Sequence, residues 1–195
     1  SLLFRPAKSW VTLTEAPPPA LSVIPFKRGK LAAFTLFREE SDKKPSKLLT
    51  EMEGFRFACQ VEEALPVAYT KNWPDGTVTP GVCLLTLFRK RPDISQEVFI
   101  DRWHNSHTPL SLRIHPLWHY NRNVVSEMLE SIEPGWGGIV EEHFYLRKQL
   151  LNPFRFFGNP LVILPRMIEV YRDTKSFLDY KTIETWLVRE YHIVS

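Results

Sequence analysis

The stretch 95–125 constrains the fold most strongly, because it predicts an amphipathic helix that passes directly into a strand. Four of the six histidines of the chain lie in this stretch. Side chains that recur at spacings of three and four share one face of a helix. Here that face consists of Phe99, Trp103, His107, Leu110 and Ile114. We expect it to pack on a sheet, with the strand beginning after Pro116.

Both ends of this predicted helix carry sequence signals. Asp93 stands three residues before Gln96, which is the spacing of a capping box, and Ser95 is a competing N-cap. Near the other end, Pro109 has no amide hydrogen and its ring crowds the carbonyl group four residues earlier, so we expect the helix to kink or change type there. Such a kink opens a gap beside His107.

His107 is an ionisable residue on an otherwise apolar stripe. Two interpretations stay open: it faces a cavity between the helix and the sheet, or it is a core histidine bonded to a backbone group. A neutral imidazole, with a pKa of about 6.5, accepts a proton from one atom and returns it to another. His107 is therefore the first candidate for a general acid or base.

Composition and charge exclude several classes of protein. The chain has 195 residues, enough for one domain with extensions or for two small ones. Its 44% hydrophobic and 24% charged residues are typical of a soluble globular protein. A net charge of +3 with mixed signs argues against nucleic-acid binding, and no apolar run reaches the roughly 20 residues of a membrane span. Cys59 and Cys83 lack metal or redox spacing, so we expect a reducing, cytoplasmic location.

The chain divides into an arm and two unequal copies of one pattern. Residues 1–30 have no sustained period and predict an extended N-terminal arm. The predicted strands 31–38 and 82–89 share the sequence Thr-Leu-Phe-Arg, which indicates an internal duplication. The first copy, 31–80, is abbreviated to strand, short helix and strand. The second copy, 81–195, is predicted to be a full domain.

This second copy predicts an α+β fold in the order βαββαβ. The strands are 82–90, 117–125, 136–143 and 186–194, and the helices are 95–114 and most of 145–180. This order is ferredoxin-like, with two helices on one face of a four-stranded antiparallel sheet. Large side chains on the other face need cover, either from a second subunit or from the partial N-terminal repeat.

Four short motifs, in order along the chain, resemble the EthD family of dimeric α/β-barrel proteins. They are WHNSHTPL, LWHYNRNVV, GGIVEEHF and FLDYKTIETWLVREYHIV. The resemblance implies a homodimer and an aromatic or polyketide-like small-molecule ligand, and His107 matches the histidine of the family's His-x-Pro-Leu motif. The aromatic insertion 154–165 and the segment 1–80 depart from the family pattern, so the resemblance does not imply a substrate.

The candidate catalytic residues are His107, Tyr120 and Arg122. In the strand that follows the helix, Tyr120 and Arg122 share a face with Trp118, whereas His119 and Asn123 share the other face. If the first face meets the helix, Tyr120 stabilises an oxyanion and Arg122 binds a carboxylate or enolate. If the second face does, His119 and Asn123 take these places, and the sequence leaves both possibilities open.

The residues predicted to bind the substrate are Trp103, Trp118, His119, Asn123, Glu141, His143 and Phe157. Glu141 and His143 share one strand face, as do Glu190 and His192 in the last strand. Glu141, His143 and His192 are secondary candidates, because such residues more often form cross-strand bonds or dimer contacts. Phe157 belongs to the insertion 154–165, which either walls a pocket or packs as core. The insertion is too short to span a membrane and lacks the basic amphipathic character of a surface helix.

A metal or haem site has weak support. His104 and His107 stand three residues apart, but His104 lies off the apolar face, and a haem would need His107 as its axial ligand. The expected function is a cofactor-independent, metal-free enzyme, a lyase or cyclase, that transfers protons on an aromatic or polyketide-like molecule. A non-catalytic small-molecule-binding or accessory protein of a degradation or biosynthetic pathway is the alternative. A haem- or metal-dependent oxygenase is the third.

Overall fold

The computed structural model describes residues 8–14, 16, 18–19, 22–37 and 47–195. Its strands are β1 (Lys8–Leu13), β2 (Ala32–Phe37), β3 (Phe57–Val67), β4 (Val82–Phe88), β5 (His119–Ser131), β6 (Gly138–Phe144) and β7 (Glu184–Val194). Its helices are α1 (Lys47–Thr50), α2 (Gln96–Asp101), the π-helix η1 (Arg102–His107), α3 (Thr108–Ile114), α4 (Arg147–Leu151), α5 (Pro153–Phe156) and α6 (Ile163–Lys175). Arg38, the last residue of the predicted strand 31–38, lies outside the described residues.

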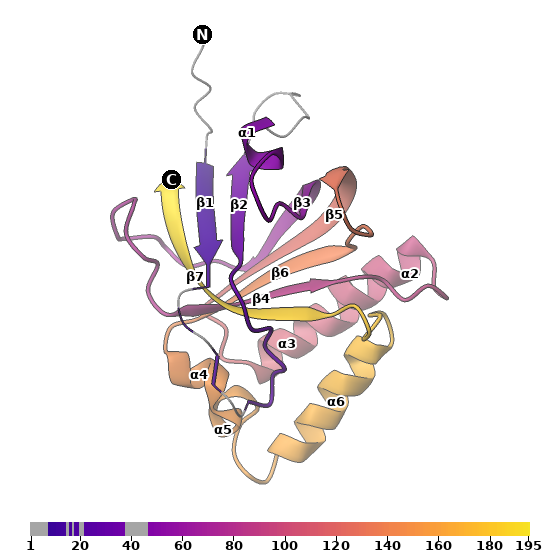
Figure 1. Ribbon diagram of the computed structural model, residues 1–195. Helices are drawn as coiled ribbons and strands as arrows, with labels where there is room; N and C mark the ends of the chain where they lie inside the picture. Colours follow the sequence, from indigo (N-terminus) through magenta and orange to yellow (C-terminus); the bar gives the residue numbers. More distant parts are fainter. Residues whose placement is uncertain (1–7, 15, 17, 20–21, 38–46) are drawn as a thin grey trace.

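The strands form one antiparallel sheet in the order β2-β1-β7-β4-β6-β5-β3. Figure 1 shows that this sheet curls like a half-barrel and that helices α2 to α6 lie together on one side of it. The face away from the helices is concave, because β3 at one edge of the sheet and β1, next to the other edge, still line one common cavity.

The predicted α+β fold, a four-stranded ferredoxin-like βαββαβ sheet with a separate partial repeat, is wrong. The chain is a mostly-β curled sheet of seven strands. β1 pairs with β7, with Trp10 opposite His192, and β3 pairs with β5, with Glu63 opposite Asn123. The N-terminal strands thus supply hydrogen-bond partners to both strands that a four-stranded sheet would leave at its edges.

The predicted helix forms in three pieces. Ser95 is the N-cap and accepts the amide of Val98, whereas Asp93 pairs with Arg91 instead. The π-helix η1 ends at His107, two residues before Pro109, and the amide of Thr108 bonds to a carbonyl five residues back. The expected change of helix type is therefore observed, at the place where proline removes an α-helical bond.

Alternation along the strands creates two cores. Val82 and Leu84 of β4 face the helices and pack with Leu110 and Ile114. Cys83, Leu85 and Leu87 face the concave side, where they join Trp136 and Trp186 and are partly covered by Leu31 and Ala33. The concave face is thus apolar toward one end, which leaves the other end for polar residues. Neither Cys59 nor Cys83 is in a disulfide, and among the described residues no helix is long and apolar enough to span a bilayer.

Candidate functional site

The concave face gathers acidic and imidazole side chains at one end. His119 lies directly opposite His143, and Asn121 lies opposite Glu141, so these four side chains project to the same side of β5 and β6. Glu190 of β7, which is separated from β6 by β4, lies on the same side, as its contacts show below. The register of β5 against β6 shows which side chains share a face, and Tyr120, which packs with Trp103 of η1, belongs to the face that meets the helices.

Glu190 is the centre of this cluster. Its Oε1 accepts hydrogen bonds from the Tyr69 hydroxyl at 2.7 Å and the Thr79 hydroxyl at 2.9 Å. His192 Nε2 lies 3.0 Å from the same oxygen, and His143 Nε2 lies 3.5 Å from Oε2. Burial opposes ionisation of the carboxyl group, but the two histidines and Tyr69 outweigh it and hold its pKa below the usual range.

Tyr69 and Thr79 reach Glu190 because the segment between β3 and β4 runs along β7. The amide of Gly76 donates to the carbonyl of His192 at 2.7 Å, and the amide of Thr79 donates to the carbonyl of Glu190 at 2.8 Å. Gly76 has a φ of 76°, a conformation that residues with a Cβ rarely adopt. This turn therefore fixes the two hydroxyl groups against the carboxylate.

The hydrogen-bond geometry assigns the tautomer of His192. Its Nε2 faces both the Glu190 carboxylate and the Tyr69 hydroxyl, at 3.0 and 2.6 Å. A carboxylate only accepts, so the proton of the neutral ring belongs on Nε2. The lone pair then lies on Nδ1, which is buried and has no hydrogen-bond partner among the described residues. Carboxylate and imidazole together form the arrangement of an oriented general base.

Glu141 is the second buried carboxyl group. Trp10 Nε1 donates to its Oε1 at 3.2 Å, and Asn121 Nδ2 donates to its Oε2 at 3.2 Å. Burial, together with the negative charge of Glu190, raises the pKa of Glu141. Two neighbouring carboxyl groups are thus pushed toward opposite protonation states, as in many acid–base sites.

A cavity of about 180 Å³ opens beside this cluster. Its lining residues are Lys8, Trp10, Leu65, Ala68, Tyr69, Lys71, His119, Asn121, Glu190, His192 and Ser195. The rings of Tyr69 and His119 have centroids 4.2 Å apart, and Trp118 lies 4.9 Å from Tyr69. Burial lowers the pKa of His119 to about 3, so this ring is neutral at physiological pH.

Several buried polar atoms around this cavity have no hydrogen-bond partner within the described residues. On the concave face they are Thr12 Oγ1, Asn121 Oδ1, Asn123 Oδ1, His143 Nε2 and His192 Nδ1. An unsatisfied buried polar atom costs about 1–3 kcal/mol, so a cluster of them in a native protein needs an explanation. A polar ligand or ordered water in the cavity would satisfy several of them.

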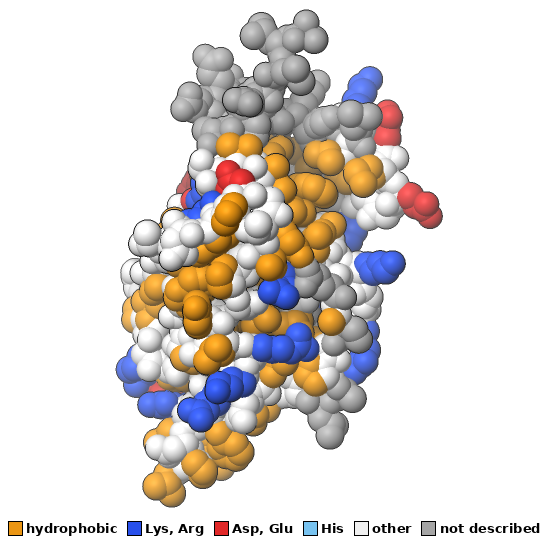
Figure 2. Space-filling view, turned by 90° about the vertical axis from the view of Figure 1, so that its left-hand side faces the viewer, with side chains coloured by type: hydrophobic (Ala, Val, Ile, Leu, Met, Phe, Trp, Pro, Cys, Tyr) orange, Lys and Arg blue, Asp and Glu red, His pale blue; other side chains and the backbone are white. Residues whose placement is uncertain are grey.

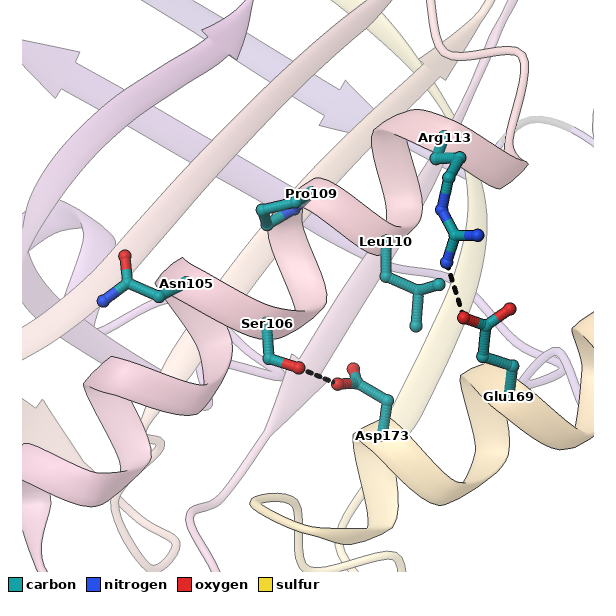
Figure 3. Close-up of a pocket in the computed structure, with 7 residues that line it drawn as sticks. All are labelled: Asn105, Ser106, Pro109, Leu110, Arg113, Glu169 and Asp173. Atoms are coloured by element: carbon teal, nitrogen blue, oxygen red, sulfur yellow. Dashed lines mark hydrogen bonds and ion pairs between the residues drawn. The ribbon is translucent and has the colours of Figure 1, made fainter.

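His107 lies on the other side of the sheet, beside a shallow groove of about 430 Å³ between the helices. Figure 3 shows the groove, whose lining residues are Asn105, Ser106, Pro109, Leu110, Arg113, Glu169 and Asp173. His107 Nδ1 is 2.7 Å from Asp173 Oδ2, and Ser111 Oγ is 3.2 Å from Nε2. This order of groups resembles an Asp-His-Ser triad, but Ser111 is only 1% exposed.

The groove is less suited to chemistry than the concave face. Both ring nitrogens of His107 already have partners, and Ser106 donates to the Asp173 carboxylate. At the other end, Arg113 pairs with Glu169. These contacts hold η1 and α3 against α6. The catalytic role of His107 stays a prediction, and its position favours a structural contact between helices.

The other predicted site residues divide between the two faces. Tyr120 is fully buried beside Trp103 in the helix-side core, and Arg122 Nη1 donates to Thr108 Oγ1 at 2.8 Å. Phe157 packs against His115 beneath α4 and α5. The concave face, by contrast, brings together His119, Asn123, Glu141 and His143. Trp118 lies at the margin of this group, where its ring contacts the ring of Tyr69. His107, Tyr120 and Arg122 therefore do not join the concave-face cluster.

Sequence reasoning missed Tyr69, Trp10 and Thr79. Tyr69 and Thr79 come from the segment between β3 and β4, where the only signal was the Asp75-Gly76 turn. Trp10 belongs to the predicted arm, whose pairing with β7 no local pattern reveals. The sequence did predict that Glu190 and His192 share a strand face. It did not show that this face is the concave one.

Among the described residues, no group of three or more His, Cys, Asp or Glu side chains is arranged to hold a metal ion. Comparisons of the chain with family models, with curated proteins and with solved structures found no match. The resemblance to the EthD family therefore stays a prediction that rests on the motifs alone.

Proposed function

We propose that the protein binds a small polar ring compound in the concave-face cavity and transfers a proton on it by general acid–base catalysis. The observation that carries this proposal is the Glu190–His192 pair, which leaves an unpartnered imidazole nitrogen in the cluster beside the cavity. Buried, oppositely perturbed carboxyl groups in a cavity are typical of catalytic sites. A curled sheet with a lined hollow also supports small-molecule binding in general.

The cavity size narrows the ligand class. An engineered protein cavity of about 150 Å³ holds benzene, whereas drug-sized ligands need roughly 300–1,000 Å³. At about 180 Å³, this cavity matches one ring with its substituents rather than a fused polyketide skeleton. The rings of Tyr69, His119 and Trp118 supply aromatic contacts for such a body.

Each residue of the cluster has a proposed role. His192 Nδ1 accepts the proton, and Glu190 positions the ring and stabilises its cationic form. Tyr69 holds the Glu190 carboxylate, and its own pKa is raised by burial and by Glu190, so the hydroxyl stays protonated. The amide oxygens of Asn121 and Asn123, which have no partner, accept hydrogen bonds from ligand hydroxyl or amine groups.

The alternative is a ligand-binding or accessory protein that performs no reaction. The same cavity and unsatisfied atoms favour it, since they require a ligand but not turnover. Membership of the EthD family and a homodimeric state remain proposals beside either function.

The test uses a panel of one-ring phenols, cyclic ketones and ring carboxylates in D₂O. Nuclear magnetic resonance measures binding from saturation transfer, and proton transfer from deuterium that enters a carbon position. Glu190→Gln and His192→Gln should lower the exchange rate by about 100-fold or more, as expected when a general base is lost. Tyr69→Phe, which keeps the ring, should cause a smaller loss.

His107→Gln is the matched control, because it alters a histidine on the opposite side of the sheet. Exchange that survives His192→Gln but disappears with His107→Gln would place the chemistry in the helix-side groove and refute the proposal. Binding to the cavity without exchange of any compound would favour the accessory protein.

A further inference from the structure

The segment 145–168 has an unusual charge balance. It contains four basic residues, Arg147, Lys148, Arg155 and Arg166, and no acidic residue. It forms α4, α5 and the beginning of α6, at the end of the molecule away from the open side of the sheet (Figure 1). The insertion 154–165 alone contains only one of these charges, so the pattern emerges when the neighbouring helices are included.

Six large hydrophobic side chains of this segment are exposed to solvent, and Tyr145, Leu146 and Ile168 are three of them. The other three are Phe154, which is 51% exposed, Leu161, which is 88% exposed, and Leu164, which is 63% exposed, and we call these three the apolar tip. Their neighbours Phe156, Phe157 and Ile163 already pack into the helix-side core, so the tip is not needed there. Figure 2 shows hydrophobic side chains at the lower end of the molecule, with Lys and Arg side chains just above them.

Specific contacts hold the loop of the apolar tip in place. Arg166 Nη1 donates to the carbonyl of Phe157 at 2.8 Å, across the turn at Gly158, whose φ is 107°. Asn159 Oδ1 accepts the amide of Leu161 at 3.0 Å. The loop is therefore a defined turn that presents Leu161 outward.

Three basic side chains of this segment have no acidic partner among the described residues. Arg147, Lys148 and Arg155 are exposed, and none of them forms an ion pair with another described residue. We call these three residues the basic collar. By contrast, Arg113 of α3 pairs with Glu169, which lies near the middle of α6.

We propose that this end of the molecule docks on an anionic lipid bilayer, independently of the function of the concave face. The apolar tip enters the boundary between headgroups and acyl chains, and the basic collar binds lipid phosphates. A protein partner is less suited, because a stable protein interface needs a broad area whose centre is depleted of charge. The tip is small and convex, and it adjoins three unpaired cations.

The test is co-sedimentation of the full chain with vesicles. Binding is expected to phosphatidylcholine vesicles that contain about 30% phosphatidylserine, and to weaken as salt is added, because the anionic surface potential is screened. Each basic residue near such a surface contributes roughly fivefold in affinity. The double variant Arg147→Gln/Arg155→Gln should therefore bind about 25-fold more weakly, and Leu161→Gln/Leu164→Gln should also lose most of its binding.

Matched controls come from the other parts of the surface. Ile132 is 77% exposed in the β5–β6 loop, and Lys181 is exposed after α6. Ile132→Gln and Lys181→Gln should bind vesicles like the wild type. Equal binding to pure phosphatidylcholine, or no binding to either vesicle, would overturn the proposal. Self-association in sedimentation velocity that Leu161→Gln abolishes would overturn it as well, by assigning the tip to contact with a second copy.

Discussion

Replacing Glu141 with glutamine should change the pH dependence of stability in a direction that the structure defines. The pKa of Glu141 is raised in the folded protein, chiefly by burial and then by Glu190. Between the unfolded pKa of about 4.3 and this raised value, the unfolded chain ionises Glu141 while the folded protein keeps it protonated. The contribution of Glu141 is therefore present at low pH and is lost as the pH rises through the folded pKa.

The magnitude follows from proton linkage. One proton held only by the folded state lowers the free energy of unfolding by about 1.4 kcal/mol for each pH unit of this interval. Glutamine cannot ionise, so the free energy of unfolding of Glu141→Gln should rise relative to that of the wild type by up to about 1.4 kcal/mol for each pH unit. The amide oxygen still accepts from Trp10, whereas the new NH₂ group faces the Asn121 NH₂ group, which also donates to Glu63 at 2.8 Å, so the substitution adds a cost that does not depend on the ionisation of residue 141.

Urea unfolding at pH values from 5 to 8 measures this difference, and comparison with the wild type at each pH cancels the other titrating groups. Glu130→Gln is the matched control, since this carboxylate lies exposed on the same sheet. This control accounts for the loss of a sheet carboxylate that is not buried. A difference between Glu141→Gln and the wild type that stays constant with pH would mean that Glu141 is ionised in the folded protein, which would refute the assignment of opposite protonation states.

Three further predictions concern the same acid–base pair and the fold. Glu190→Gln should show the opposite sign: the wild type is more stable above pH about 4.3, and this advantage is lost as the pH falls, because the folded pKa is lowered. Acid titration of unfolding checks it. Gly138→Ala should destabilise by about 1–3 kcal/mol, since a Cβ there would lie 2.5 Å from the buried Trp103 ring, and thermal unfolding against Gly135→Ala, which meets only a flexible side chain, is the comparison. Ser95→Ala should cost about 1 kcal/mol through loss of the N-cap of α2, measured by urea unfolding, whereas Asp93→Ala should cost less.

The sequence predicted those features that depend on local spacing. The apolar helix face is buried, with Phe99 and Trp103 fully enclosed, because spacing along a helix alone determines which side chains share a face. The change of helix type before Pro109 has the same local origin. His107 follows the periodicity too, but periodicity does not reveal its partner, Asp173, which comes from a distant helix.

The features that escaped prediction depend on strand pairing between distant segments. Alternation showed that Glu190 and His192 share a face, but the side of the sheet on which a cavity forms depends on how the whole sheet curls. β1 and β3 flank the strands β7, β4, β6 and β5 and bring Trp10 and Tyr69 to the cluster. If β1 belongs to an arm and β3 to a separate repeat, no cavity is expected between these strands. The sequence therefore predicted His107, the one ionisable residue of the helix face, as the catalytic residue.

The two faces of the sheet also differ in how completely side chains fill them. On the helix side, large apolar residues such as Trp103 and Phe99 fill the space, so that an ionisable residue there is held by other side chains. On the concave side no helix packs, and the polar residues of one sheet end bond mainly to one another. Buried polar atoms left without partners accumulate where packing is incomplete, and that is also where a ligand gains most by entering. We therefore propose that the site lies on the sheet face that the helices leave open, whereas the aromatic face of the helix packs as core.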